Sequence, residues 1–160
     1  MTAVEKGVME AMTSGGPMGH PVVDLEVTLT DGKFHAVDSS EMSFKMAGSL
    51  GFKEAAAKAR PILLEPISEL VITVPEAYQG DVMGDLNSKR GRIQGTTSVG
   101  NGEQEITALV PTSEVIRYAI DLRSLTGGRG RFVATHSHYD PAPPNLADKI
   151  VAEAAAAREG

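Results

Sequence analysis

The chain has no cysteine and no tryptophan, and only four phenylalanines and three tyrosines among its 160 residues. Without cysteine it has no disulfide, no catalytic thiolate and no cysteine-ligated zinc. So few aromatic side chains argue against nucleic-acid binding by base stacking. No apolar run approaches the ~20 residues that span a bilayer, and no signal pattern opens the chain. We therefore expect a cytoplasmic protein with an aliphatic, Met-rich core.

The charge is acidic overall, with a formal net charge of −6 at pH 7. This argues against a protein that coats nucleic acid non-specifically, because such binding needs many Lys and Arg side chains on phosphates. Two local basic groups remain, Lys89, Arg90 and Arg92 in the first and Arg117, Arg123, Arg129 and Arg131 in the second. Taken alone, such groups are typical of a salt-bridged surface.

The first 60 residues show two helical patterns and two extended ones. Periodicity predicts a helix over Ala3–Thr13 and a second, amphipathic helix that starts at the polar run Asp38–Glu41 and ends before Pro61. Alternation predicts strands over Val22–Thr30 and Lys33–Val37. Methionines recur at helical spacing, and we attribute them to core packing: Met9, Met12, Met18, Met42, Met46 and Met83.

From about Glu65 to Tyr139 the elements follow the order β-α-β-β-α-β. The predicted strands are Leu70–Val74, Arg92–Thr97, Glu105–Val110 and Arg131–His138, and the predicted helices are Glu76–Lys89 and Thr112–Leu125. The middle strands form a hairpin around Gly100-Asn101-Gly102. This order indicates a ferredoxin-like fold, an antiparallel sheet with two helices on one face. An Ala-rich stretch from Asn145 to Arg158 predicts a terminal helix.

Several motifs occur in a fixed order along the chain. They are His35, Val37–Glu41, Pro61–Pro66, Gly80–Leu86, Lys89–Gly91, Val110-Pro111, Tyr118-Ala119 and Leu122–Ser124. In this order they resemble elongation factor G, from the end of its fourth domain through its fifth, over about residues 3 to 145. Many ordered blocks carry far more weight than one motif would.

The resemblance implies an α+β chain. A truncated ribosomal-protein-S5-like α/β domain would span residues 1–62, a ferredoxin-like domain 63–141, and a tail or helix 142–160. It also implies strands upstream of the Ala3 helix in the same small domain. A lone strand at Val22–Thr30 would leave backbone groups unpaired. We therefore expect the C-terminal part of a larger factor, which in isolation pairs its open sheet edge with a second copy.

The family resemblance also implies a function. The parent would be a translational GTPase that moves tRNA and mRNA on the ribosome, with GTP and magnesium bound in an N-terminal domain outside these residues. This chain has no GxxxxGK[ST] phosphate loop, and we expect no catalytic residue, cofactor or metal in it. The implied contacts with tRNA and mRNA are His35 at the tip, with Gly16, Pro17, Gly19 and His20. The implied contacts with ribosomal RNA are Lys89, Arg90, Arg123 and Arg129.

The sequence departs from the usual family pattern at three places. Val115-Ile116-Arg117-Tyr118-Ala119 stands in place of a Phe-Gly-Tyr-Ala step, Gly127 replaces a Gln, and His20 replaces a Tyr. These changes favour a divergent paralogue, which could act in ribosome recycling or protection instead. Two alternatives from other classes stay open. One is a stand-alone RNA- or protein-binding module, and the other is a small metal hydrolase that uses His136, His138 and Asp140.

Overall fold

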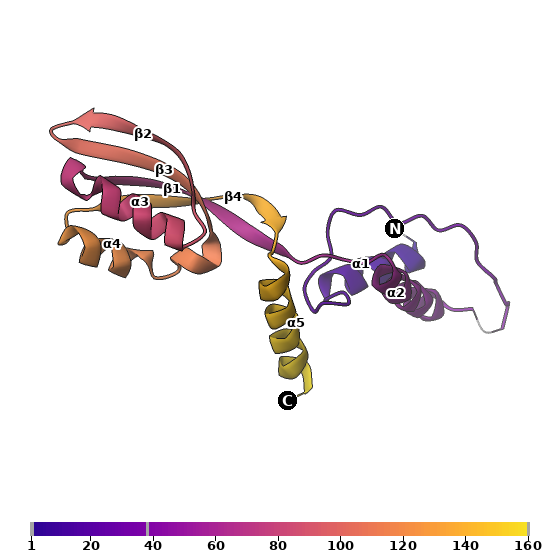
Figure 1. Cartoon of the computed structure of the whole chain (residues 1–160). Coiled ribbons are helices and arrows are strands. Elements are labelled where there is room, and N and C mark those ends of the chain that lie inside the picture. Colours follow the sequence, from indigo (N-terminus) through magenta and orange to yellow (C-terminus); the bar gives the residue numbers. More distant parts are fainter. Residues whose placement is uncertain (1, 38, 160) are drawn as a thin grey trace. The chain divides into compact units, whose positions relative to one another are not determined.

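The structure is a computed structural model that describes residues 2–37 and 39–159. It divides into two compact units, one of residues 1–63 with 143–160 and one of residues 64–142. Both are drawn in Figure 1, and we describe each by itself. The helix cap predicted at Asp38 falls partly outside the described residues, because position 38 is not among them.

The second unit is a four-stranded antiparallel sheet with strand order β2-β3-β1-β4. Its strands are β1 (Leu64–Pro75), β2 (Arg92–Gly100), β3 (Glu103–Pro111) and β4 (Arg131–Pro141), and its helices are α3 (Gln79–Ser88) and α4 (Tyr118–Thr126). Two short 3₁₀ helices precede these, η1 (Glu76–Tyr78) and η2 (Thr112–Val115). Figure 1 shows α3 and α4 on the same side of the sheet. The predicted ferredoxin-like order is confirmed.

One face of the sheet forms the core of this unit. Successive strand side chains point to opposite faces, so alternate residues of β1 and β3 are buried under the helices. The buried set is Leu70, Ile72, Val74, Ile106, Ala108 and Val110 from the strands, with Val82, Leu86, Tyr118 and Leu122 from the helices. The hairpin between β2 and β3 turns through Gly100, Asn101 and Gly102, all with positive φ. Its predicted position is confirmed.

The helix predicted to start at Thr112 is interrupted. Its first turn is the 3₁₀ helix η2, and α4 begins only at Tyr118. The Thr112 hydroxyl does not cap a helix, because it hydrogen-bonds the Ser68 hydroxyl of β1 at 2.8 Å. The local pattern predicted that Thr112 caps the helix, but its hydroxyl is used in a hydrogen bond to a neighbouring strand instead.

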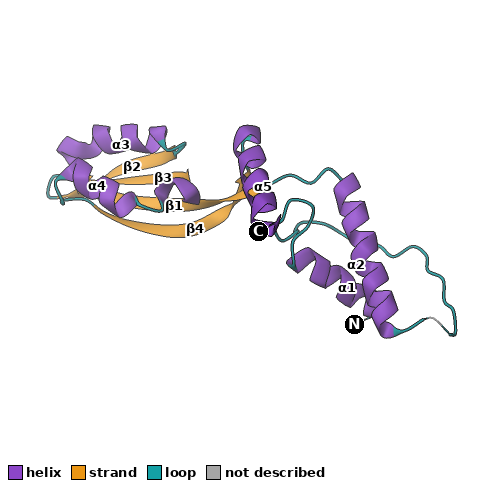
Figure 2. Cartoon of the chain, turned by 90° about the horizontal axis from the view of Figure 1, so that it is seen from below, coloured by secondary structure: helices purple, strands orange, loops and turns teal. Residues whose placement is uncertain are grey.

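The first unit contains α1 (Ala3–Thr13) and α2 (Glu41–Lys58), seen from below in Figure 2. Thr2 and Glu5 form a capping box at the start of α1. The Ser40 hydroxyl accepts the Ser43 backbone N–H at the start of α2. Both predicted helices are confirmed, and a side-chain hydrogen bond caps the start of each.

The two helices cross at their glycines. A Cβ added at Gly7 would lie 1.9 Å from the Lys45 carbonyl oxygen, and one at Gly48 would lie 2.6 Å from that of Val4. The backbones therefore touch directly. Beside this contact the helices bury a small cluster of Val8, Ala11, Phe52 and Ala56.

The predicted strands at Val22–Thr30 and Lys33–Val37 do not form. Residues 21–37 join α1 to α2 and take part in no strand. A strand needs a neighbour for its N–H and C=O groups, and the described part of the first unit contains no other strand to supply one. The alternating apolar side chains are consequently exposed, by 58% at Val23, 40% at Leu25, 49% at Val27 and 67% at Leu29.

The core interpretation of the methionines is wrong at three positions. Met9, Met42 and Met46 are 48%, 63% and 58% exposed, whereas Met12 and Met83 pack against the buried clusters. Leu50 of α2 is also 63% exposed. One exposed side of α2 is therefore apolar, and the described residues of the first unit contain no sheet that could cover it.

The Ala-rich C-terminal stretch forms α5 (Pro144–Glu159), as predicted. Its first turn is closed by the N–H groups of Leu146 and Ala147, which both donate to the Pro143 carbonyl. A proline at the first helical position suits this start, because its missing N–H would have no partner there. Among the described residues, no helix combines the length and the apolar character needed to cross a bilayer.

Candidate functional site

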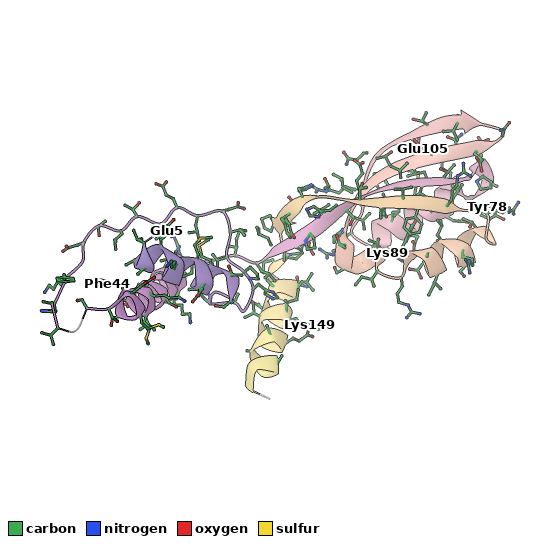
Figure 3. All side chains as sticks on the ribbon, turned by 180° about the vertical axis from the view of Figure 1, so that it is seen from behind. Glu5, Phe44, Tyr78, Lys89, Glu105 and Lys149 are labelled. Carbon is green, nitrogen blue, oxygen red and sulfur yellow. The ribbon has the colours of Figure 1, made fainter. Side chains whose placement is uncertain are left out.

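The tip segment before α2 presents His35 to solvent. The His35 backbone N–H donates to the Ser39 hydroxyl at 2.8 Å, and its carbonyl accepts the Ser39 N–H at 2.9 Å. Neighbouring Phe34 stacks on Phe44 of α2, with ring centroids 6.4 Å apart (Phe44 is labelled in Figure 3). The backbone is therefore anchored to the start of α2, while the imidazole offers a donor and an acceptor outward.

The loop after α1 is a tight turn built on glycine. Gly16 N–H donates to the His20 carbonyl at 3.0 Å, and Gly19 N–H donates to the Gly16 carbonyl at 3.0 Å. Gly19 has φ of 84°, and a Cβ at Gly16 would lie 2.2 Å from a Val22 methyl. Pro17 and His20 are exposed on the outside of this turn.

The two predicted tRNA-contacting groups do not lie together. The turn at residues 16–20 follows the C-terminal end of α1, and the tip segment precedes the N-terminal end of α2. Figures 1 and 2 both show these two loops well apart within the first unit. They form two separate exposed points, not one surface.

Lys89, predicted to contact RNA, is paired within the second unit. Its ammonium lies 2.8 Å from Asp85 and 3.3 Å from Asp121. The hydrogen bond to Asp85 is the main cause that raises the pKa of Lys89. With its side chain only 17% exposed, Lys89 has its charge neutralised between α3 and α4 (Figure 3).

Arg90 is engaged even more fully. Its guanidinium binds Glu65 through two hydrogen bonds of 2.7 and 2.9 Å, and a third, of 3.2 Å, reaches Glu114. Glu65 is only 8% exposed, and hydrogen bonding to Glu65 is the main cause that raises the pKa of Arg90. Two planar hydrogen bonds to one carboxylate are the strongest form of this pair. Arg90 thus joins the end of α3 to β1 and η2.

The backbone of Arg90 is unusual for a residue with a side chain. Its φ is 59°, in the left-handed region, and α3 ends there with Gly91 N–H donating to the Leu86 carbonyl at 2.8 Å. Glycine normally occupies this position of a helix end, because it carries no steric penalty there. The backbone alone would favour glycine here, and the hydrogen bonds of the Arg90 side chain to Glu65 and Glu114 offset this steric cost.

The remaining arginines divide into paired and unpaired ones. Arg92 pairs with Asp140, and Arg131 with Glu103. Arg129 lies over the Tyr78 ring, 4.9 Å from its centroid, and hydrogen-bonds its hydroxyl (Tyr78 is labelled in Figure 3). Arg117 and Arg123 are exposed, and within the described part of the chain neither forms an ion pair.

Tyr118 of α4 is a buried polar group that sequence reasoning missed. Its hydroxyl and one carboxylate oxygen of Asp85 are both buried, and neither has a hydrogen-bond partner among the described residues. Burial is the main cause that raises the pKa of Tyr118, with the nearby charges of Asp85 and Asp121 adding to it. The ring packs edge-on against Phe132, with centroids 5.1 Å apart. The Tyr118 ring therefore stabilises the core by packing against Phe132, whereas its hydroxyl contributes no hydrogen bond among the described residues.

Replacing Tyr118 with Phe should remove an alkaline instability of the second unit. Because the folded state raises this pKa, the stability is complete below the ordinary tyrosine pKa of about 10 and is lost as the pH rises towards the folded value. We expect wild-type stability to fall by about 1.4 kcal/mol per pH unit above pH 10, and Tyr118→Phe to flatten this fall. Urea unfolding between pH 8 and 11 measures it. If the unfolding free energies of wild type and Tyr118→Phe fell equally with pH, the alkaline instability could not be assigned to Tyr118.

The sequence-based metal site is not assembled. The His138 ring lies 3.2 Å from Asp140, and its other nitrogen hydrogen-bonds the Ser137 hydroxyl. His136 packs instead against the ring of Tyr139. Within residues 2–37 and 39–159, no group of three or more His, Asp or Glu side chains is placed to hold a metal ion. His136, His138 and Asp140 therefore do not form one metal-binding group in the part of the chain that the structure describes.

Comparisons with known proteins cover both units. A family model described as "Elongation factor G, domain IV" matches residues 1–60, and one described as "Elongation factor G C-terminus" matches residues 62–150. The chain is 54% identical over 151 residues to elongation factor G of Aquifex pyrophilus, covering 94% of this chain and 22% of that protein. A crystal structure from Thermus thermophilus matches with a TM-score of 0.87 and 42% identity, covering 96% of this chain and 23% of that one. The chain thus spans about a fifth of the length of these relatives.

Proposed function

Because the chain belongs to the elongation factor G family, we propose that it forms the ribosome-contacting part of a translational GTPase that moves tRNA and mRNA. The observation that carries this proposal is the match of both units, in order, to the family's domain IV and C-terminal models. In this proposal residues 1–62 act as the fourth domain, 63–141 as the fifth, and 142–160 as a tail. GTP and magnesium belong to a domain outside these residues.

The proposed contacts differ between the two units. His35 meets the tRNA–mRNA complex through its imidazole, and the turn at residues 16–20 makes a separate contact. In the second unit Arg123 and Arg129 meet ribosomal RNA, because their guanidinium groups are exposed. Lys89 and Arg90 contribute by holding the domain together, since bound carboxylates already neutralise their charges.

Replacing His35 with alanine in the full-length factor should slow translocation and leave GTP hydrolysis largely unchanged. The imidazole is exposed and supports no buried group, so the fold should tolerate its loss. Rapid kinetics of tRNA movement and phosphate release measure the two activities separately. Lys33→Ala, in the same exposed segment, is the matched control and should leave both unchanged. An equal loss of both activities in His35→Ala would contradict a tip role.

Cosedimentation of the 160-residue chain with ribosomes across a salt series should show affinity that falls as salt rises. Removing one phosphate contact with Arg123→Ala should make the slope of log affinity against log salt shallower by about one. Arg131→Ala is the control, because Glu103 already neutralises that arginine. An unchanged slope for Arg123→Ala would argue against its contact with RNA.

For the 160-residue chain in isolation, we also propose pairing with a second copy through residues 23–31. An antiparallel pairing centred on Val27 places Leu25 opposite Leu29, Glu26 opposite Thr28 and Asp24 opposite Thr30. Apolar side chains then share one face, and no two carboxylates stand opposite each other. The exposed apolar side chains of Met42, Met46 and Leu50 are available to be covered by such a two-stranded ribbon.

Val27→Lys should abolish this association, because the pairing places residue 27 opposite itself and sets two ammonium groups face to face. Thr28→Lys is the control for register, since it would stand opposite Glu26 and should preserve or strengthen the dimer. Analytical sedimentation at several protein concentrations measures both. A wild-type mass that stays monomeric at every concentration would rule out the pairing.

A further inference from the structure

The turn between β2 and β3 is built on an Asn-Gly pair. Asn101 and Gly102 have positive φ, of 54° and 74°, and lie between the paired residues Gly100 and Glu103. Two such central residues are typical of a type I′ hairpin turn, for which Asn-Gly is a preferred sequence. The same pair is chemically labile, because an asparagine amide is followed by a backbone N–H that no side chain shields.

The surroundings of this turn leave room for a reaction. Asn101 and Gly102 are exposed, and a Cβ added at Gly102 would meet nothing within 4 Å. β2 is an edge strand of the sheet, and every residue of it except Ile93 is exposed (Figure 1). The register of β2 with β3 also shifts between Ser98 and Gly100, directly before the turn. An exposed edge hairpin with irregular pairing opens locally more easily than a central strand, so the turn can reach the geometry that ring closure needs.

We propose that Asn101 is a site of spontaneous deamidation in the folded chain, with aspartate and isoaspartate as products. The Gly102 backbone nitrogen attacks Cγ of Asn101 and gives up its proton. The bond between Cγ and the side-chain nitrogen breaks, and that nitrogen leaves as ammonia. The new bond closes a five-membered succinimide ring. This modification goes beyond the proposed function and does not depend on it.

Water completes the reaction by adding to one of the two carbonyl carbons of the ring. Opening at Cγ gives aspartate with the ordinary backbone. Opening at the backbone carbonyl carbon gives isoaspartate, in which the chain continues through the side-chain carbon. Water is the only co-reactant, and the net change replaces the NH₂ of the amide by OH.

The isoaspartate form loosens the contact between the turn and the start of η1. The Gly102 carbonyl accepts the Glu76 N–H at 2.9 Å. Isoaspartate inserts one additional backbone carbon between residues 101 and 102, which moves this carbonyl away from Glu76. Both products also add a carboxylate next to Glu103, whose own carboxylate binds Arg131 through two hydrogen bonds of 2.9 Å.

The chain contains its own controls for this reaction. Its two other asparagines are also exposed, but Asn87 lies in α3 before Ser88, and Asn145 lies in α5 before Leu146. At both positions a helical backbone and the side chain of the following residue oppose ring closure. Asn101→Gly is the matched variant, because Gly-Gly also suits a type I′ turn and carries no amide.

A second source of isoaspartate has to be told apart from Asn101. The Gly32 N–H donates to the Asp31 carboxylate at 2.7 Å, so this Asp-Gly pair also places a side-chain carbonyl carbon beside a glycine nitrogen. Isomerisation of an aspartate expels one water and takes one back, and therefore leaves the mass unchanged. Deamidation of Asn101 changes the mass, so peptide mapping separates the two.

The test keeps the 160-residue chain for several weeks at pH 7.5 and at pH 8.5, folded and in urea, beside Asn101→Gly. Mass spectrometry of its peptides detects the exchange of NH₂ for OH, and an isoaspartyl carboxyl methyltransferase with labelled methyl donor detects isoaspartate. We expect Asn101 in the folded chain to react about tenfold faster than Asn87 and Asn145. Its rate should rise about tenfold from pH 7.5 to 8.5, because the attacking nitrogen must lose its proton. Asn101→Gly should show neither product in this peptide.

Amide exchange measures the effect on the turn. In the isolated isoaspartyl form the Glu76 amide should exchange about fivefold faster than in the unmodified chain. Unchanged exchange there would overturn this effect. An Asn101 that reacts in urea but stays intact in the folded chain would overturn the proposed site, because the turn would then protect it. Equal reaction of all three asparagines, or isoaspartate confined to the peptide of Asp31, would overturn it as well.

Discussion

Gly7→Ala should unfold the α1–α2 unit. The new Cβ would lie 1.9 Å from the Lys45 carbonyl oxygen and 2.8 Å from its carbon, so backbone atoms, which cannot turn aside as a side chain does, block it. The helices would have to separate, and the cluster of Val8, Ala11, Phe52 and Ala56 would lose its packing. We expect a cost of about 3 kcal/mol, at the upper end for overpacking. Hydrogen exchange of the amides in α1 and α2 measures this unit separately.

The control lies in the partner helix of the same crossing. Gly51 sits inside α2, and a Cβ there would meet nothing within 4 Å. Gly51→Ala should therefore stabilise the unit by about 0.5 to 1 kcal/mol, since alanine is the better helix former. Exchange in β1 and β3 of the second unit should not change in either variant. If Gly7→Ala left α1 and α2 as protected as the wild type, the helices would not cross at this contact.

Arg90→Ala should destabilise the second unit by about 2 to 3 kcal/mol. It leaves the carboxylate of Glu65, which is 8% exposed, without its two hydrogen bonds. Removing one partner of a buried pair costs about 3 to 5 kcal/mol, and we take less because the arginine side chain is one-third exposed. Urea unfolding followed by hydrogen exchange in β1 measures the loss.

A second substitution separates charge from packing. Glu65→Gln in the Arg90→Ala background should recover part of the stability, because it removes the stranded charge. Arg90→Gly should be milder than Arg90→Ala, since glycine relaxes the backbone at φ of 59°. Full stability of Arg90→Ala would show that the pair contributes nothing. Weaker ribosome binding by Arg90→Ala could result from the loss of folded protein alone. Arg123→Ala is therefore the better test of RNA contact.

Local signals were sufficient for most of the fold. The caps at Thr2 and Ser40 and the alternation along β1 and β3 are encoded within a few residues, and the structure follows them. The segment around Val27 shows the limit of this reasoning. Its apolar and polar residues alternate as regularly as those of β1. A strand forms only beside another strand, however, and the residues of this segment do not show whether a partner strand is present.

The candidate site was less predictable for the same reason. The basic character of Arg90 is visible in the sequence, but its partners are 25 and 24 positions away, at Glu65 and Glu114. No local signal in the sequence marked this pair. Only the structure shows that Arg90, and not Gly91, takes the left-handed position at the end of α3, where the sequence alone would favour the glycine.

The glycine crossing has a mechanical consequence for the tip. His35 is tied to the start of α2 through Ser39, and Phe34 rests on Phe44 in the first turns of that helix. At Gly7 and Gly48 the helix meets α1 with no side chain between the backbones. A force on the tip is therefore transmitted to α1 through contacts between peptide groups. Such contacts deform less than contacts between side chains, which can change rotamer. We therefore expect α1 and α2 to move as one rigid body when force acts on the tip. One methyl group added at the crossing would separate the helices and let them move independently.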